Sequence, residues 1–122
     1  MIHEDLTEKI IESFFTVYNR LGYGFLESVY EKAIIIELKA QGVGVLSQVP
    51  ITVRYKKQEV GKFYADLLIE NRVIVELKVS EKIAKEHEYQ LRNYLRATDI
   101  EVGLLLNFGR KPQFKRKIFS NP

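Results

Sequence analysis

Residues 64–78, which read Tyr64-Ala-Asp-Leu-Leu-Ile-Glu-Asn-Arg-Val-Ile-Val-Glu-Leu-Lys78, decide the fold of this chain. Two runs rich in Val, Ile and Leu flank the polar tripeptide Glu-Asn-Arg, a pattern typical of two strands joined by a tight turn. Asp66 interrupts the first run, and Glu76 and Lys78 interrupt the second. Because a charged side chain is costly inside a buried strand unless something balances it, these three residues mark a candidate functional site.

The register of the predicted hairpin determines which of these charges meet. A three-residue loop over residues 70–72 would place Asp66 opposite Glu76, with Cβ atoms about 4.5–5.5 Å apart. Lys78 would then point to the same face as Glu76. A two-residue loop would shift the register by one residue and separate the carboxylates. We favour the three-residue loop because it sorts the apolar side chains cleanly between the two faces.

Periodicity along the rest of the chain predicts an α/β fold with the element order α-α-β-β-β-α-β. Ser80 is a suitable residue to cap the third helix. The predicted helices cover residues 6–21, about 25–41 and 80 to about 97; the predicted strands cover residues 48–55, 62–69, 73–79, 102–107 and, as a short final strand, 115–119; a polar turn covers residues 56–59.

Length and composition limit the class of protein. A chain of 122 residues with 46% hydrophobic and 11% aromatic residues is long enough to bury a core as one domain over residues 1–122. The absence of cysteine excludes disulfides and thiolate metal sites and fits a cytoplasmic location. The acidic start does not resemble a secretory signal, and no apolar run approaches the roughly 20 residues that span a bilayer. We therefore expect a soluble protein without membrane contact.

The positive charge of the chain is concentrated near its C-terminus. The net charge is +3, and residues 103–122 contain no acidic residue, so the preceding residues sum to about −2. Such a basic segment, over about residues 110–122, suggests a contact with nucleic acid, because neutralising phosphates releases counterions. A solvated tail that aids solubility is the alternative interpretation. The candidate contact residues are Arg110, Lys111, Lys115, Arg116 and Lys117.

Paired carboxylates without nearby thiolates favour a hard cation. Mg²⁺ or Mn²⁺ would accept Asp66 and Glu76 as ligands and keep several waters, leaving positions for substrate phosphates. The backbone carbonyl of Leu77 is a further candidate ligand. Lys78 would orient a water or stabilise charge on a phosphoryl group. The alternative is a purely structural role, in which the charges pair with one another inside the sheet.

The order of these residues resembles the PD-(D/E)XK nuclease superfamily. Asp66 precedes Glu76-Leu-Lys78, and the pair lies between a helix with Glu27 and a helix with Gln90 and Tyr94. The resemblance covers about residues 6–108. One departure is Ala65, which stands where the superfamily's name has proline.

Two shorter motifs narrow the resemblance. Gly24-Phe-Leu-Glu-Ser-Val-Tyr30 is similar to the signature of the small GxxExxY protein family, and Gln90-x-x-x-Tyr94 is similar to an extra motif of the RecB-like branch. Gln90 and Tyr94 are one helical turn apart, so both side chains can face the same site.

The resemblance implies a restriction-endonuclease-like core, in which helices flank a mixed central β-sheet. It also implies an active site where Glu27, Asp66, Glu76 and Lys78 converge around Mg²⁺ or Mn²⁺, with Glu27 binding the ion directly or through water. Gln90, Tyr94 and Tyr30 would contact the substrate or support the ligands. A carboxylate at the start of a helix is also favoured by helix electrostatics alone, which is the alternative for Glu27.

Two classes of function follow. The first is a Mg²⁺-dependent nuclease that hydrolyses phosphodiester bonds in DNA or RNA. The second is a catalytically silent nuclease-fold binding module, or a subunit of a nucleic-acid-processing complex, because a minimal core carries no separate domain for target recognition. A homodimer would let so small a core act on two strands.

Overall fold

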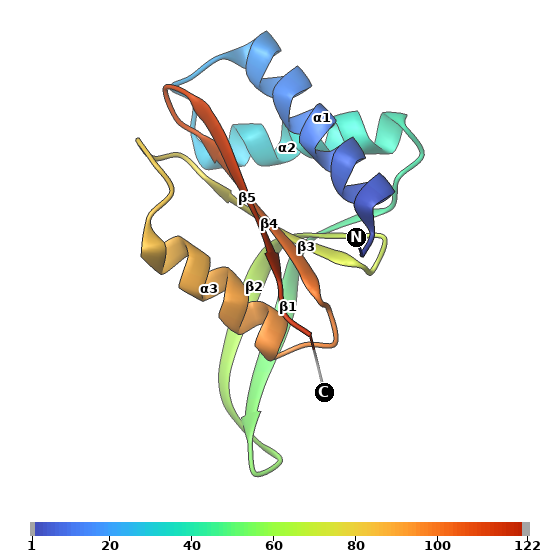
Figure 1. Ribbon diagram of the computed structural model, residues 1–122, viewed down its shortest axis with the longest axis vertical. Coiled ribbons are helices and arrows are strands. Elements are labelled where there is room, and N and C mark those ends of the chain that lie inside the picture. The colour runs from blue at the N-terminus through green and yellow to red at the C-terminus, as the bar shows by residue number, and fades with distance from the viewer. Residues whose placement is uncertain (1, 121–122) are drawn as a thin grey trace.

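The computed structural model describes residues 2–120 and shows an α/β fold (Figure 1). The element order agrees with the prediction and includes the final strand, which begins at Pro112. The helices are α1 (Glu4–Leu21), α2 (Glu27–Ala40) and α3 (Lys85–Arg96), and the strands are β1 (Val45–Tyr55), β2 (Gln58–Ile69), β3 (Val73–Lys78), β4 (Val102–Phe108) and β5 (Pro112–Ile118).

A single five-stranded mixed sheet organises the molecule. The strand order is β1-β2-β3-β4-β5; β3 and β4 are parallel, and all other neighbours are antiparallel. The helix α3 makes the crossover that a parallel pair requires. Helices α1 and α2 cover one face and α3 covers the other (Figure 1), so the predicted restriction-endonuclease-like architecture is confirmed.

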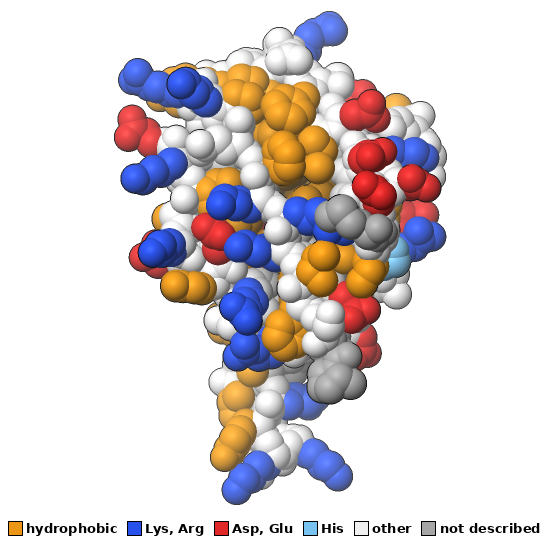
Figure 2. Space-filling model, in the orientation of Figure 1, with side chains coloured by type: hydrophobic (Ala, Val, Ile, Leu, Met, Phe, Trp, Pro, Cys, Tyr) orange, Lys and Arg blue, Asp and Glu red, His pale blue; other side chains and the backbone are white. Residues whose placement is uncertain are grey.

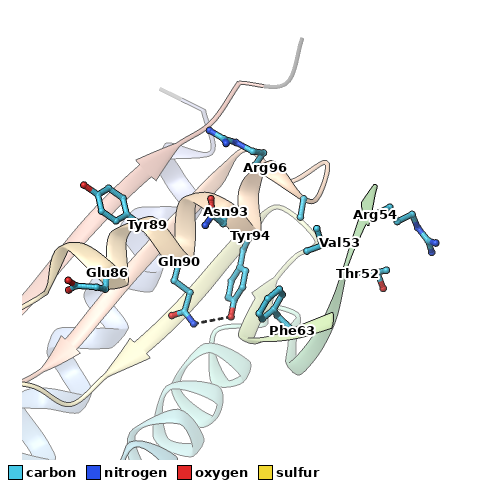
Figure 3. A pocket seen from close by; sticks show the side chains of 11 residues that line it. Thr52, Val53, Arg54, Phe63, Glu86, Tyr89, Gln90, Asn93, Tyr94 and Arg96 are labelled. Carbon is cyan, nitrogen blue, oxygen red and sulfur yellow. Dashed lines mark hydrogen bonds between the residues drawn. The ribbon is translucent and has the colours of Figure 1, made fainter. Parts of the chain in front are cut away.

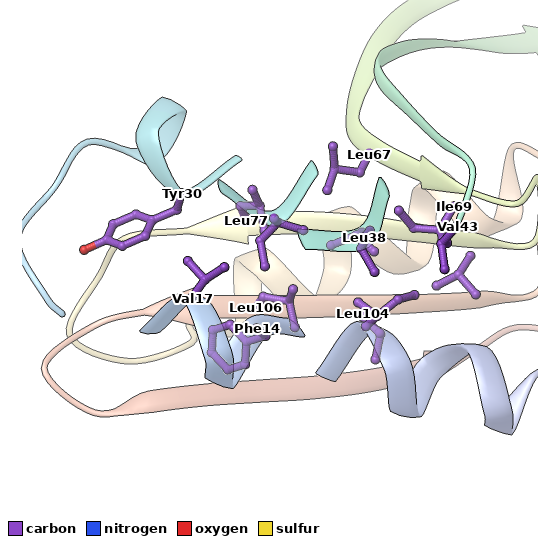
Figure 4. Packing of buried hydrophobic residues seen from close by; sticks show 14 of the residues in the cluster. Phe14, Val17, Tyr30, Leu38, Val43, Leu67, Ile69, Leu77, Leu104 and Leu106 are labelled. Carbon is purple, nitrogen blue, oxygen red and sulfur yellow. The ribbon is translucent and has the colours of Figure 1, made fainter. Parts of the chain in front are cut away.

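The continuous apolar run of β3 follows from this layering, since both of its faces are covered. Val75 and Leu77 pack with α1 and α2 in the larger core (Figure 4), whereas Ile74 packs with Leu91 and Leu95 of α3. A strand buried on both sides loses the polar alternation of a half-exposed strand. Glu76 is therefore a carboxylate in a doubly covered strand, and only 3% of it is exposed.

The hairpin formed by β1 and β2 extends well beyond the rest of the sheet (Figure 1). Tyr55 pairs with Gln58, and the two residues between them, Lys56 and Lys57, have φ angles of 50° and 65°. Two positive φ values in a two-residue loop are the mark of a type I′ turn. The predicted four-residue turn at 56–59 was therefore too long, and both strands begin earlier than predicted.

The start of α3 differs from the prediction as well. Its N-cap is Ala84, and the backbone N–H of Ala84 donates to Nδ1 of His87 at 3.1 Å. Ser80 does not cap the helix, which begins only at Lys85, and the Ser80 hydroxyl donates to the Lys82 carbonyl at 2.8 Å. The backbone N–H of Ser80 donates to Oδ1 of Asn107 on β4 at 3.0 Å. The Nδ2 group of Asn107 donates back to the Ser80 carbonyl at 2.9 Å. This buried amide ties the end of β3 to β4, a contact between residues 27 positions apart that no local pattern reveals.

Across residues 2–120, none of the helices combines the length and the apolar character that a transmembrane segment needs.

Candidate active site

The predicted register of the central hairpin is confirmed. Ile69 pairs with Val73 and Leu67 pairs with Val75, so residues 70–72 form the three-residue loop. Glu70 and Asn71 have positive φ values, which allows the backbone N–H of Arg72 to donate to the Ile69 carbonyl at 2.9 Å. One residue farther along this register, Asp66 and Glu76 face each other.

Each of the two carboxylates accepts a hydrogen bond from a backbone N–H of the other strand. The backbone N–H of Asp66 donates to Oε2 of Glu76 at 2.7 Å, and the backbone N–H of Leu77 donates to Oδ2 of Asp66 at 2.8 Å. The backbone pairs of β2 and β3 end at Leu67 and Val75, so the side chains take over where the strands separate. Both acids are thus held at a split in the sheet by hydrogen bonds to backbone amides.

The alternation of side chains between the two faces of the sheet is interrupted in β2 at Asp66. Ala65 and Leu67 are two residues apart and would share a face in a regular strand, yet Ala65 packs on the α3 side and Leu67 on the α1–α2 side. Across from Asp66, Gln48 of β1 has a φ of 51°. This distortion, flanked by the regular pairs Ser47–Leu67 and Val49–Ala65, turns the Asp66 side chain toward β3.

Glu76 is held in a setting that disfavours its charge. Burial, and then the negative charge of Asp66, raises the pKa of Glu76 from 4.5 to about 8, while Lys78 and the hydrogen bond from Asp66 act in the opposite direction. Two carboxylates this close keep a proton or attract a cation. The negative potential at the Asp66–Glu76 pair therefore favours the binding of a proton or a cation.

Lys78 is oriented by α3. Its Nζ donates to Oε1 of Gln90 at 3.2 Å, and Nε2 of Gln90 donates to the hydroxyl of Tyr94 at 3.1 Å. Tyr94 is buried in the smaller core, and its hydroxyl is held by the bond from Gln90. Burial and the charge of Glu76 raise the pKa of Tyr94. The structure therefore brings together Lys78, Gln90 and Tyr94 as one hydrogen-bonded chain.

Glu27 is the first residue of α2, the helix on the face of the sheet opposite to α3 (Figure 1). Its carboxyl group is close enough to Asp66 to interact with it electrostatically. Although the residue is exposed overall, partial burial of its carboxyl group, followed by the charge of Asp66, raises its pKa. Glu31 lies one turn farther along α2, and its pKa is raised by burial and by Asp66, against the hydrogen bond from Gln48. The spacing from Glu27 to Glu31 was the signal that could have identified Glu31.

Gln48 is a further residue that the sequence did not indicate. Its Nε2 donates to Oε1 of Glu31 at 2.9 Å and lies 3.5 Å from Oδ1 of Asp66. Gln48 thus links Glu31 of α2 to Asp66. Its position depends on the distortion of β1, which has no sequence pattern of its own.

Tyr30 lies behind the site and is fully buried. Its hydroxyl donates to the Gly22 carbonyl at 2.6 Å and accepts from the backbone N–H of Phe25 at 3.2 Å. The ring stacks on Phe108 with centroids 4.1 Å apart. The Tyr30 side chain is thus closed off from solvent in this structure, and its hydrogen bonds hold the loop that precedes Glu27.

Comparison with known proteins identifies the family of the chain. A family model for the PD-(D/E)XK nuclease superfamily matches residues 4–117. The chain belongs to this superfamily. The order of Asp66 and Glu76-Leu-Lys78 in the sequence is the order of acidic residues and lysine in that name.

A solved structure, titled as the crystal structure of SSO0001, has the same fold. It is similar with a TM-score of 0.62 and 17% sequence identity, covering 98% of this chain and 61% of that chain. This chain thus spans about three fifths of the length of that relative. A search of curated proteins found no match.

The oxygen atoms of this candidate site fit a hard cation in part. Among residues 2–120, His, Asp and Glu side chains do not form a group of three or more arranged to hold a metal. Two carboxylates do meet, and Mg²⁺ commonly takes one or two protein carboxylates and completes its shell with water. Leu77 adds a carbonyl, because the N–H and C=O of one strand residue point to the same side, and its N–H points at Asp66.

The basic segment is divided between the faces of the sheet. Arg116 donates to the Ile2 carbonyl on the α1 side, and Phe114 packs against Phe15 there. Lys117 forms an ion pair with Glu88 of α3, on the opposite face. Figure 2 shows Lys and Arg side chains gathered over α3 and β5. A groove between these two elements includes Lys85, Arg92 and Lys117.

Of the other three basic residues, Lys115 is exposed on β5 opposite Leu105, and two lie near the turn between β4 and β5. Arg110 and Lys111 are exposed, and the Arg110 guanidinium stacks over the Tyr23 ring at 5.8 Å. Because Lys78 pairs with Asn107 in the parallel ladder, this turn is at the same end of the sheet as Lys78. The five predicted contact residues thus do not form one patch.

Proposed function

We propose that this protein is a metal-dependent nuclease that hydrolyses phosphodiester bonds of DNA or RNA. The observation that carries the proposal is the reciprocal hold of Asp66 and Glu76 at the split between β2 and β3, with Lys78 next to it. Superfamily membership supports the same reading. A purely structural ion pair would not need two carboxylates side by side.

A bound Mg²⁺ or Mn²⁺ would supply a Lewis acid for the phosphoryl oxygens and lower the pKa of a bound water. The residues that would hold it are Asp66, Glu76, the Leu77 carbonyl and, directly or through water, Glu27. In hydrolysis, the oxygen of water bonds to phosphorus while the bond to the leaving oxygen breaks, and a proton of that water ends on the leaving oxygen.

Lys78 has a fixed position and lies close to the carboxylates, as a cation that stabilises this reaction must. Its Nζ is positioned by Gln90, and it lies at the mouth of the split beside the carboxylates. A preorganised donor at this point stabilises the negative charge that develops on the phosphoryl oxygens. Gln90 and Tyr94 therefore act as positioning residues, and Arg110 and Lys111 are candidates for contact with the flanking phosphates.

We further propose the narrower assignment to the GxxExxY family and the RecB-like branch. The burial of Tyr30 behind the loop of Gly22 and Phe25 gives a physical role to the tyrosine of that signature. We also propose that the chain acts as one nuclease-like domain in the cytoplasm, with Mg²⁺ or Mn²⁺ as its cofactor. A homodimer is a further prediction that sedimentation can test.

Cleavage assays with matched variants test the proposed activity. Purified protein is incubated with single-stranded and duplex DNA and RNA in Mg²⁺ or Mn²⁺, beside Lys78→Ala and the exposed Lys39→Ala on α2 as control. We expect cleavage that depends on the metal, is retained in Lys39→Ala and falls at least about 100-fold in Lys78→Ala, as for loss of a preorganised charge donor. Cleavage by Lys78→Ala at the rate of the control would refute the proposal.

Calorimetry with Mn²⁺, together with the cleavage assay, separates the alternatives. A catalytically silent binding module would bind Mn²⁺ or nucleic acid without turnover. A structural charge cluster would bind no Mn²⁺, and the ion would not stabilise the fold.

A further inference from the structure

The strongest unassigned feature is a groove between the projecting β1–β2 hairpin and α3. It has a volume of about 850 Å³, within the range of pockets that take small ligands. Val53 and Phe63 line the hairpin side, and Tyr94 and Asn93 line the α3 side (Figure 3). Gln90 lines it too, so this groove is continuous with the residues that position Lys78.

Aromatic side chains contribute to the lining of this groove. Phe63 is 46% exposed although its ring lies 5.8 Å from that of Tyr94. Figure 3 shows the two rings side by side, with the Tyr94 hydroxyl bonded to Gln90. An aromatic face left open in a concave surface is suited to stack on a flat ligand. The amides of Gln90 and Asn93 add hydrogen-bonding groups that could meet the edge of such a ligand.

The hairpin that forms one wall is basic. Residues 52–63 carry four cations, Arg54, Lys56, Lys57 and Lys62, against the single anion Glu59, and all five are exposed. Figure 2 shows Lys and Arg side chains at the projecting end of the molecule. Arg96 and Glu86 are the charged residues that α3 adds to the groove. The charge of the wall therefore favours a polyanion.

We propose that this groove holds an unpaired base of the nucleic-acid strand whose phosphodiester lies at Lys78, while the hairpin lysines contact the phosphates of the same strand. The inference rests on the proposed function and narrows its substrate class to strands with an unpaired segment beside the cleaved bond. A paired base cannot use the groove, because its faces are stacked and its edge is bonded to the opposite strand.

Fluorescence anisotropy in EDTA tests the groove without cleavage. The probes are a short labelled oligothymidylate, the matching oligouridylate and a blunt G·C-rich duplex. We expect Phe63→Ala to weaken single-strand binding about 5- to 150-fold, the range for loss of one stacking partner, with little change for the duplex. Tyr64→Ala is the matched control, since Tyr64 is 52% exposed and points to the other face of the same strand.

Salt dependence tests the hairpin. The double variant Lys56→Asn, Lys57→Gly removes two positive charges and installs the residues that a type I′ turn prefers, so the hairpin should keep its shape. For a single strand we expect the slope of log K against log salt to shrink by about 1.4, at about 0.7 per lost phosphate contact. Removing two exposed lysines elsewhere, Lys9→Ala with Lys39→Ala, should leave the slope unchanged.

The outcomes separate this inference from the proposed function. Equal losses in Phe63→Ala and Tyr64→Ala, or equal losses for single strand and duplex, would overturn the groove assignment even if the protein cleaves. A selective single-strand loss in Phe63→Ala supports the groove even if no cleavage is found.

Discussion

Replacing Glu76 with glutamine should make the metal-free protein less sensitive to pH. In the folded protein the pKa of Glu76 rises to about 8 from 4.5, mainly through burial and then through the charge of Asp66. At about 1.4 kcal/mol per unit, ionising Glu76 in the folded state costs about 4 to 5 kcal/mol more than in the unfolded chain. Glutamine has nearly the same shape, can still accept from Asp66 N–H, and carries no charge.

The sign follows from proton binding. Between pH 4.5 and 8 the folded state holds the Glu76 proton more tightly than the unfolded state, so stability falls as pH rises through this window. From pH 5 to pH 8 we expect wild type to lose about 2 to 4 kcal/mol through this group. Glu27 and Glu31, whose pKa values are also raised, act in the same direction but are unchanged in the variant.

The assay is urea denaturation in EDTA, followed by circular dichroism at pH 5 and pH 8. Glu76→Gln should lose about 2 to 4 kcal/mol less than wild type over this interval, and the exposed Glu8→Gln on α1 should match wild type. Saturating Mg²⁺ at pH 8 should stabilise wild type by about 2 to 3 kcal/mol at a hundredfold excess over Kd, and the variant much less. An equal pH dependence of wild type and Glu76→Gln would show that Glu76 is already ionised at low pH, and the charge argument would fail.

Three further substitutions, the last with a matched control, test how the site is supported, each by chemical denaturation. Tyr30→Phe removes the hydroxyl that bridges two backbone groups and should cost about 1–2 kcal/mol; an unchanged midpoint would contradict the bridge. Asn107→Ala strands the backbone groups of Ser80 and should cost about 1–3 kcal/mol; a smaller loss would mean that water replaces the amide. Gly109→Ala would place a Cβ 2.3 Å from the Ser80 carbonyl and should cost about 1–3 kcal/mol, whereas Gly44→Ala meets only the Glu70 side chain and should cost less; the reverse order would refute the close approach.

The fold class was predictable because its signals are local. Apolar residues at helical spacing and continuous apolar runs depend on neighbours a few positions away, and they indicated the helices and strands in the right order. Boundaries were less accurate where a long-range contact decides them. Ser80 has the chemistry of a helix cap, yet Asn107 takes its backbone groups and α3 starts only at Lys85.

The meeting of Asp66 and Glu76 was predictable from the sequence by itself, because one three-residue loop sets the register of a hairpin. Only the tertiary structure decided how deeply Glu76 is buried and therefore how far its pKa rises. It also decided that Gln48 and Glu31 border the site and that the β1–β2 hairpin faces α3. These features join segments far apart in the chain, and the free energy of such contacts depends on packing that no short stretch of sequence contains.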